Sequence, residues 1–127
     1  MTIAPENRKL TGFAHFFAAA GYSAGGFARA WKEAAFRQEI GAGVVLAAIY
    51  MAVGVDMSTA LAALILFLVL IAFEAINTAI EDIVDRISPE VSLTAKHAKD
   101  LGSFAVLCLL VANGALLARV LYSAVVG

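Results

Sequence analysis

Charged residues and cysteine are both scarce in this chain. Charged residues make up 15% of its 127 residues, with a formal net charge of −1, whereas a typical soluble domain carries about 25%. Because there is no strong basic balance, the sequence predicts no nucleic-acid partner. The single cysteine, Cys108, excludes an intrachain disulfide and by itself builds no zinc site. The length allows one domain and is too short for a doubly wound nucleotide-binding fold.

Hydrophobic residues, by contrast, make up 62% of the chain, and the mean hydropathy is +0.89. A helix needs about 20 mostly apolar residues to cross the hydrocarbon core of a membrane. Three stretches qualify, at about residues 36–56, 60–85 and 100–126, and none shows the strict alternation of a barrel strand. The short link after the first stretch predicts an antiparallel hairpin. We therefore predict an all-α membrane protein with three transmembrane helices and a single domain over residues 1–127.

The N-terminal region has a different pattern. Its opening, MTIAPENRKL, is polar and is followed by no compact apolar run, so we predict no signal peptide. From Phe13 to Trp31, aromatic and alanine side chains recur at three- and four-residue steps. This pattern predicts an amphipathic helix over about residues 10–32 that lies along the membrane surface, with its aromatic side chains among the lipid headgroups.

The distribution of lysine and arginine predicts the orientation in the membrane. These residues gather before the first span (Arg8, Lys9, Arg29, Lys32, Arg37) and between the second and third spans (Arg86, Lys96, Lys99). The link at Asp56 has none, and the C-terminal end has only Arg119. Because cytoplasmic loops are enriched in lysine and arginine, we expect the first two regions in the cytoplasm and the hairpin tip and C-terminus outside.

The second span contains a polar face. Thr78 and four residues with acid or amide side chains, Glu74, Asn77, Glu81 and Asp85, fall within an arc of roughly 100° on a helix. A carboxylate inside a span costs at least about 2.5–3.5 kcal/mol, which makes it a candidate for function. The alternative is that these groups only form hydrogen bonds between helices. That role does not require several acids on one face.

Acids that share a helix face repel one another unless cations neutralise them. One source of positive charge is the segment of residues 96–100 (KHAKD), which we expect to be a loop at the start of the third span. Another is Mg²⁺, with Glu81 and a second carboxylate as oxygen ligands. The sequence has neither a GxxxxGK[ST] motif nor a dinucleotide fingerprint. A kinase here would hold triphosphate with lysine, asparagine and metal on helices, which phosphoryl transfer tolerates.

Three spans in a single subunit cannot enclose the polar face and shield it from lipid. Small residues in the spans, such as Gly43 and Ala105, allow close approach of helices. Asn113 lies in the middle of the third span and requires a partner, for which an interhelical hydrogen bond is the simplest choice. We therefore predict an oligomer whose active site is shared between neighbouring subunits.

Four segments carry a resemblance to a known family. Residues 74–86 (EAINTAIEDIVDR) closely resemble the signature ExxNxAxExxxD of the bacterial integral-membrane diacylglycerol kinases. Residues 98–103 (AKDLGS), 19–23 (AAGYS) and 33–39 (EAAFRQE) match further segments of that family in the same order. The resemblance covers about residues 11–126. The undecaprenol kinases share this architecture and much of the signature.

The resemblance implies a homotrimeric helical bundle in the bacterial cytoplasmic membrane that transfers the γ-phosphoryl group of Mg-ATP to the hydroxyl of diacylglycerol, giving phosphatidic acid. Glu74 would be the general base, and Glu33 and Glu81 would bind Mg²⁺. The ATP-binding set would be His15, Tyr22, Glu33, Asn77, Glu81, Asp85, Glu90, Ser92, Lys99 and Asp100. The lipid-binding set would be Ser23, Trp31, Arg37, Glu74 and Ser103.

Two alternatives to a diacylglycerol kinase stay open. Undecaprenol is the alternative acceptor within the same fold; Arg86 and the form KDLGS favour diacylglycerol. From a different class, a small oligomeric proton-coupled exporter would also use one intramembrane glutamate. Such an exporter would place its acid near the membrane midplane, and it would not need Glu33, Lys99 or Asp100.

Overall fold

The computed structural model describes residues 11–127. The described chain consists of four α-helices: α1 (Gly12–Trp31), α2 (Ala34–Val53), α3 (Met57–Ile87) and α4 (Leu93–Val126). No strand occurs between residues 11 and 127, which confirms the all-α prediction. Residues 1–10 lie outside the described residues. They include the polar opening and residue 10, the first of the predicted surface helix.

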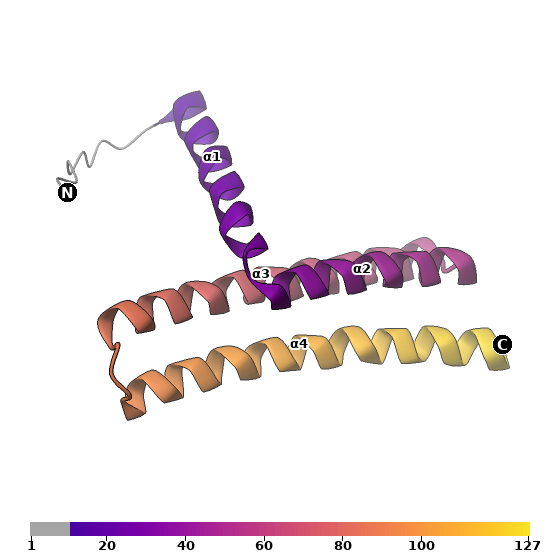
Figure 1. Cartoon of the computed structure of the whole chain (residues 1–127). Coiled ribbons are helices and arrows are strands. Elements are labelled where there is room, and N and C mark those ends of the chain that lie inside the picture. The colour runs from indigo at the N-terminus through magenta and orange to yellow at the C-terminus, as the bar shows by residue number, and fades with distance from the viewer. Residues whose placement is uncertain (1–10) are drawn as a thin grey trace.

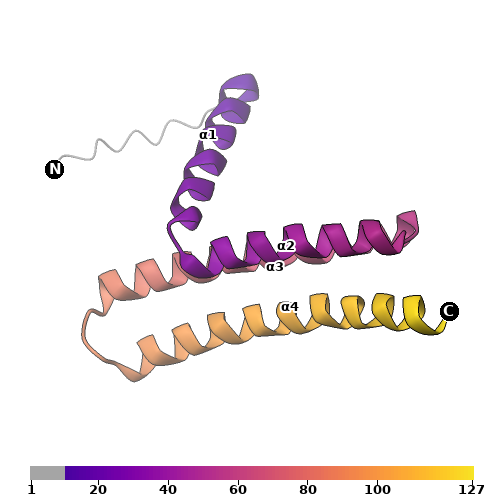
Figure 2. The same cartoon turned by 45° about the vertical axis from the view of Figure 1, so that its right-hand side comes forward.

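Helices α2, α3 and α4 run side by side, and α1 extends away from them at the point where it joins α2 (Figure 1, Figure 2). Only α2, α3 and α4 among the described helices are long and apolar enough to cross a membrane. This confirms the predicted set of three membrane-spanning helices. The homotrimer remains a prediction.

A glycine and an aspartate form the tip of the α2–α3 hairpin. Gly54 ends α2 in the left-handed conformation, with φ at 76°, and its N–H donates to the carbonyl of Tyr50 over 3.0 Å. Glycine adopts this conformation without the steric cost that a Cβ imposes. Asp56 then caps α3, because its Oδ1 accepts a hydrogen bond from the N–H of Thr59 at 2.8 Å. These two caps explain how so short a link reverses the chain.

Replacement of the capping aspartate should lower stability in a pH-dependent way. Hydrogen bonds from Thr59 lower the pKa of Asp56, so its contribution is present above the ordinary carboxyl pKa of about 3.9 and is lost as the pH falls through the lower folded value. We expect Asp56→Ala to lower the thermal midpoint in detergent by roughly 2–5 °C at pH 7. The difference from the original protein should shrink below pH 4; a difference that is constant with pH would contradict this.

Helices α3 and α4 pack closely. The side-chain amide of Asn113 donates to the carbonyl of Leu66 on α3, at 3.1 Å, and to that of Leu109 on its own helix, at 2.8 Å. The predicted interhelical role of Asn113 is therefore confirmed. Nearer the other end, a Cβ at Gly102 would collide with the side chain of Asn77. The glycine thus lets α4 approach the polar face of α3.

The structure corrects the sequence-based prediction for residues 96–100. The segment is not a loop, because α4 already begins at Leu93. Ser92 caps this helix by accepting a hydrogen bond from the N–H of Ala95 at 3.1 Å. Lys99 and Asp100 therefore project from a rigid helix.

Aromatic side chains form the corner between α1 and α2. Trp31 stacks on Phe27 with 5.8 Å between ring centroids, and the buried Phe36 of α2 meets Phe27 edge-on at the same distance. Arg37 donates a 2.6 Å hydrogen bond to the carbonyl of Trp31, at the C-terminal end of α1. These contacts fix the end of α1 against α2.

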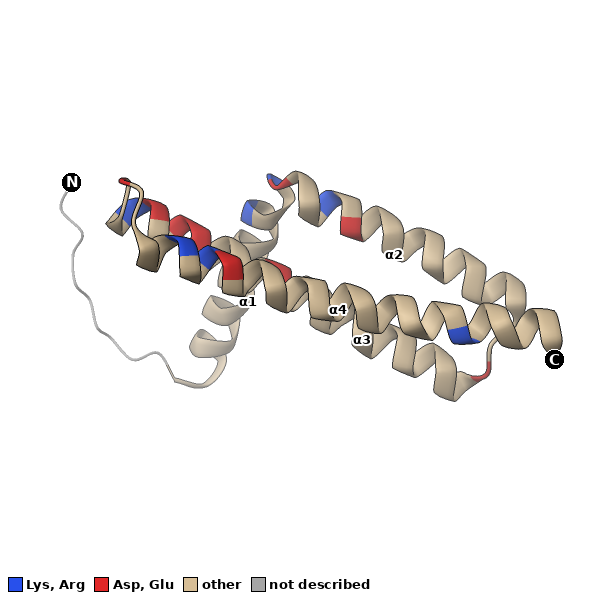
Figure 3. Cartoon of the chain, turned by 90° about the horizontal axis from the view of Figure 1, so that it is seen from below, with Lys and Arg blue, Asp and Glu red and all other residues tan. Residues whose placement is uncertain are grey.

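The charged side chains gather at one end of the bundle. They lie on the C-terminal half of α3, the first turns of α4 and the junction of α1 with α2 (Figure 3). The opposite end, at the hairpin tip and the C-terminus, is nearly free of charge in the same view. The chain thus has one polar end, which we call the charged rim.

Candidate active site

The polar face of α3 forms the centre of the charged rim. Glu74, Asn77 and Thr78 are only 6%, 9% and 5% exposed, although they follow directly on an apolar run. The Thr78 hydroxyl donates to the backbone carbonyl of Glu74 at 3.1 Å, and the amide of Asn77 donates to Oε1 of Glu81 at 3.4 Å. These bonds fix Glu81 relative to Asn77 and leave the Glu74 carboxyl free of Thr78.

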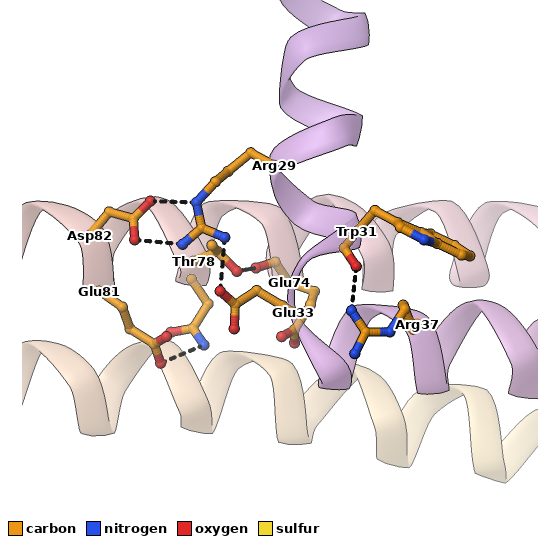
Figure 4. Close-up of polar contacts among 9 residues, drawn as sticks. Arg29, Trp31, Glu33, Arg37, Glu74, Thr78, Glu81 and Asp82 are labelled. Atoms are coloured by element: carbon orange, nitrogen blue, oxygen red, sulfur yellow. Dashed lines mark hydrogen bonds and ion pairs between the residues drawn. The ribbon is translucent and has the colours of Figure 1, made fainter.

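Further carboxyl groups surround Glu74. Glu33, in the short turn that separates α1 from α2, and Glu81, one turn beyond Asn77 on α3, both lie within electrostatic range of Glu74. Figure 4 shows Glu33 and Glu74 directed toward the same space below Arg29. Residues that are 41 positions apart in the sequence therefore contribute to one acidic cluster, which consists of Glu33, Glu74 and Glu81.

Glu39 is a further acid to which the sequence analysis assigned no role. It lies on α2, and its carboxyl group interacts with that of Glu74. One of its oxygens, Oε2, is buried without a hydrogen-bond partner among the described residues. The signal that could have found it was an acid in the second turn of an apolar helix, the same signal that identified Glu74.

Two cations face these acids from different helices. Arg29, in the last turn of α1, binds Glu33 at 2.8 Å and Asp82 of α3 at 2.7 Å. The hydrogen bonds with Asp82 and then Glu33 hold the pKa of the Arg29 guanidinium above its usual value. Lys99 of α4 pairs with Asp85 at 2.6 Å and lies within electrostatic range of Glu81.

Three other predicted ATP-binding residues lie close to the rim but not at Glu74. Asp100 pairs with Lys96 on α4 at 2.5 Å. Glu90 and Ser92 lie in the α3–α4 link, where both bond to the hydroxyl of Ser88, each at 3.1 Å. The link is therefore organised by its own side chains.

The structure does not bring the remaining predicted residues to Glu74 within one chain. His15, Tyr22 and Ser23 are exposed on the part of α1 that extends away from the long helices. Trp31 and Arg37 are occupied at the α1–α2 corner. Ser103 is exposed on α4. A neighbouring subunit would have to complete a site that contains all of these residues.

The acidic cluster fits Mg²⁺ better than a metal held only by protein. Within residues 11–127, no group of three or more His, Cys, Asp or Glu side chains could hold a metal ion. Magnesium usually takes only one or two carboxylates and completes its octahedron with water and substrate phosphates. The oxygens of Glu33 and Glu81 supply that kind of donor. Asn77 is not a further oxygen donor here, because its Oδ1 lies against Gly102 of α4 and its amide N–H faces Glu81.

An apolar cavity of about 480 Å³ lies elsewhere, toward the hairpin tip between α2 and α3. Tyr50, Phe67 and Asn113 are among its lining residues, and none of the acids lines it. The candidate active site is therefore the charged rim rather than this cavity.

Comparison with known proteins identifies the family. The family model for prokaryotic diacylglycerol kinase matches residues 21–121. A Sinorhizobium protein named diacylglycerol kinase is 58% identical over 106 residues, which are 84% of this chain and 77% of the relative. The Escherichia coli diacylglycerol kinase is 43% identical over 99 residues, covering 76% of this chain and 80% of that protein.

The Pseudomonas aeruginosa diacylglycerol kinase is 44% identical over 98 residues, covering 75% of this chain and 78% of that protein. The matched region includes the C-terminal half of α1, all of α2 and α3, most of α4 and every residue of the acidic cluster. Buried acids on an apolar helix, three helices able to span a membrane and these matches lead to one conclusion: the chain is an enzyme that belongs to the prokaryotic diacylglycerol kinase family.

Proposed function

We propose that this protein is a lipid kinase that transfers the γ-phosphoryl group of Mg-ATP to the hydroxyl of diacylglycerol and releases phosphatidic acid and ADP. The observation that carries the proposal is the buried Glu74, which lies where an apolar helix reaches a charged rim. A lipid alcohol approaches such a position from the membrane, and a nucleotide approaches it from water. The names of the related proteins support diacylglycerol as the lipid.

Glu74 acts as the general base. Its carboxylate accepts the proton of the lipid hydroxyl while the hydroxyl oxygen bonds to the γ-phosphorus. The bond from that phosphorus to the β–γ bridging oxygen breaks, and ADP leaves. Burial of Glu74 at 6% exposure keeps bulk water from competing with the lipid hydroxyl as acceptor of the phosphoryl group. Such proton transfer contributes about 10²–10⁴-fold to a rate.

The remaining groups at the rim orient and neutralise the triphosphate. Glu33 and Glu81 would hold Mg²⁺, which offsets the charge of the transferring phosphoryl group when bound. Asn77 orients Glu81 through its 3.4 Å hydrogen bond and would orient phosphate oxygens. Lys99, held by Asp85 at 2.6 Å, supplies a fixed positive charge for phosphate oxygens.

The other predicted contacts follow from an assembly of three copies. Phe13, Phe16 and Phe17 are 83%, 66% and 68% exposed on α1 in the single chain, and a membrane surface or a neighbouring subunit would cover them. A homotrimer would place α1 of one subunit against the rim of another. His15, Tyr22, Asp85, Glu90, Ser92 and Asp100 would then border the nucleotide, and Ser23, Trp31, Arg37 and Ser103 the lipid headgroup.

The membrane orientation of the proposal places the charged rim in the cytoplasm. The N-terminal region through the start of α2, the end of α3 and the first turns of α4 carry most of the lysine and arginine, so they face the compartment that contains ATP. The hairpin tip and the C-terminus lie on the other side of the cytoplasmic membrane.

A side-by-side assay tests the proposal. The purified protein in detergent is supplied with Mg-ATP and with either diacylglycerol, undecaprenol or no lipid. We expect phosphatidic acid to form faster than undecaprenyl phosphate, with little ATP hydrolysis when lipid is omitted. Faster phosphorylation of undecaprenol would make that lipid the acceptor. Absence of any phosphorylated lipid would overturn the proposed reaction.

A further inference from the structure

We propose that the side chain of Arg29 occupies the place of a divalent metal ion beside Glu33 until that ion binds. Arg29 is thus a positioning residue, and Asp82 determines how strongly it is held to Glu33. The inference rests on the proposed function, because it takes Glu33 as a metal ligand. It concerns two residues, Arg29 and Asp82, to which neither the sequence motifs nor the proposed mechanism gives a role.

The guanidinium group of Arg29 is shared between two carboxylates. Its Nε and Nη2 donate to the two carboxylate oxygens of Asp82, at 3.1 and 2.7 Å, and its Nη1 donates to Oε1 of Glu33 at 2.8 Å. Two parallel bonds to one carboxylate make the Asp82 side the geometrically specific one. Asp82 therefore anchors the Arg29 side chain, and Glu33 accepts a bond only from the remaining nitrogen, Nη1 (Figure 4).

Electrostatics give this arrangement a consequence for metal binding. Glu33 lies within electrostatic range of Glu74, so an unpaired Glu33 would raise the repulsion within the acidic cluster. Arg29 relieves that repulsion in the absence of metal. A divalent cation at Glu33 would lie within a few ångströms of the guanidinium and repel it. We therefore expect metal binding to weaken the contact between Arg29 and Glu33, while the bidentate bond to Asp82 keeps the arginine on α3.

Substitutions at Arg29 and at Asp82 should therefore change the affinity for a divalent metal ion in opposite directions. Arg29→Gln removes the competing cation, so we expect Mn²⁺ to bind about 3- to 10-fold more tightly. Asp82→Asn removes the anchoring charge, so Arg29 pairs more fully with Glu33, and Mn²⁺ should bind about 3-fold more weakly. A purely structural role in docking α1 on α3 would move both variants in the same direction, because both break the same ion pair.

Mn²⁺ binding to the full-length protein in detergent with a non-hydrolysable ATP analogue, followed by electron paramagnetic resonance, tests the inference. Trp31, the single tryptophan, lies two residues from Arg29, and its fluorescence gives a second readout as metal displaces the arginine. Arg29→Lys keeps the positive charge but not the two parallel bonds to Asp82, so it should bind Mn²⁺ no more tightly than the original protein. Arg119→Gln, which removes an exposed cation near the opposite end of α4, is the matched control and should change nothing.

Three results would overturn the inference. The Mn²⁺ affinity could change in the same direction for Arg29→Gln and Asp82→Asn, or it could rise as much for Arg29→Lys as for Arg29→Gln. The original protein could also bind no Mn²⁺ at all. The diacylglycerol assay on the same preparations separates failure of this inference about Arg29 from failure of the proposed function. If the original protein phosphorylates diacylglycerol but the two shifts agree in sign, only the role of Arg29 is wrong.

Discussion

Replacing Glu74 with glutamine should lower the rate of lipid phosphorylation by about 10²–10⁴-fold, the usual contribution of a positioned general base. Glutamine has nearly the same shape as glutamate but cannot accept the proton. The change also spares the local structure, because Thr78 bonds to the backbone carbonyl of residue 74 and not to its side chain. The measurement is the initial rate of phosphatidic acid formation at saturating Mg-ATP.

A control at the other end of the molecule separates loss of the base from loss of the fold. Asp56→Asn changes an acid at the hairpin tip, far from the charged rim, and should keep full activity. The Glu74→Gln protein should also elute at the same position as the original protein in size-exclusion chromatography. If it retained full activity with ATP and diacylglycerol, Glu74 would not be the base.

Replacing either Glu81 or Glu33 with glutamine should raise the Mg²⁺ concentration required for half-maximal activity by about 10-fold or more. Mutation of residues that only support a metal ligand already lowers metal affinity by about 10–100-fold. At residue 81 the amide oxygen of glutamine preserves an acceptor for Asn77, which now bonds to Glu81 Oε1. The effect would then reflect the lost charge rather than a lost hydrogen bond. A Mg²⁺ titration at fixed ATP measures it.

The outcome of that titration distinguishes a metal ligand from an acid that supports the reaction without binding the metal. A higher Mg²⁺ requirement with a maximal rate that recovers at high Mg²⁺ assigns the residue to the metal. An unchanged Mg²⁺ requirement, whatever the maximal rate, would remove Glu33 or Glu81 from the metal site.

Local patterns predicted much of this fold. Apolar length alone predicted the three long helices, because each must satisfy its backbone internally. Helical spacing placed Glu74, Asn77 and Thr78 on one face, and the structure buries all three together. The cap at Ser92 was also readable from the sequence, as a serine directly before a helical segment, but the charged residues at 96–100 were interpreted as a loop.

Long-range contacts account for what local patterns did not predict. Arg29 and Asp82 are 53 residues apart, and their pairing depends on the angle at which α1 leaves the α2 corner. The close approach of Gly102 to Asn77 depends on the register between α3 and α4. Neither the angle nor the register has a signature within a single helix. Glu39 has such a signature, as an acid in an apolar helix, but its proximity to Glu74 depends on how α2 packs against α3.

A crystal structure of the protein with Mg²⁺ and a non-hydrolysable ATP analogue tests the central claim most directly. We expect Glu81 to bind the metal at about 2.0–2.1 Å and Lys99 to donate to a phosphate oxygen at about 2.7–2.9 Å. Glu74, from the same or a neighbouring subunit, should face the γ-phosphate from the membrane side. A nucleotide bound where none of these three side chains, from any subunit, contacts it would contradict the account.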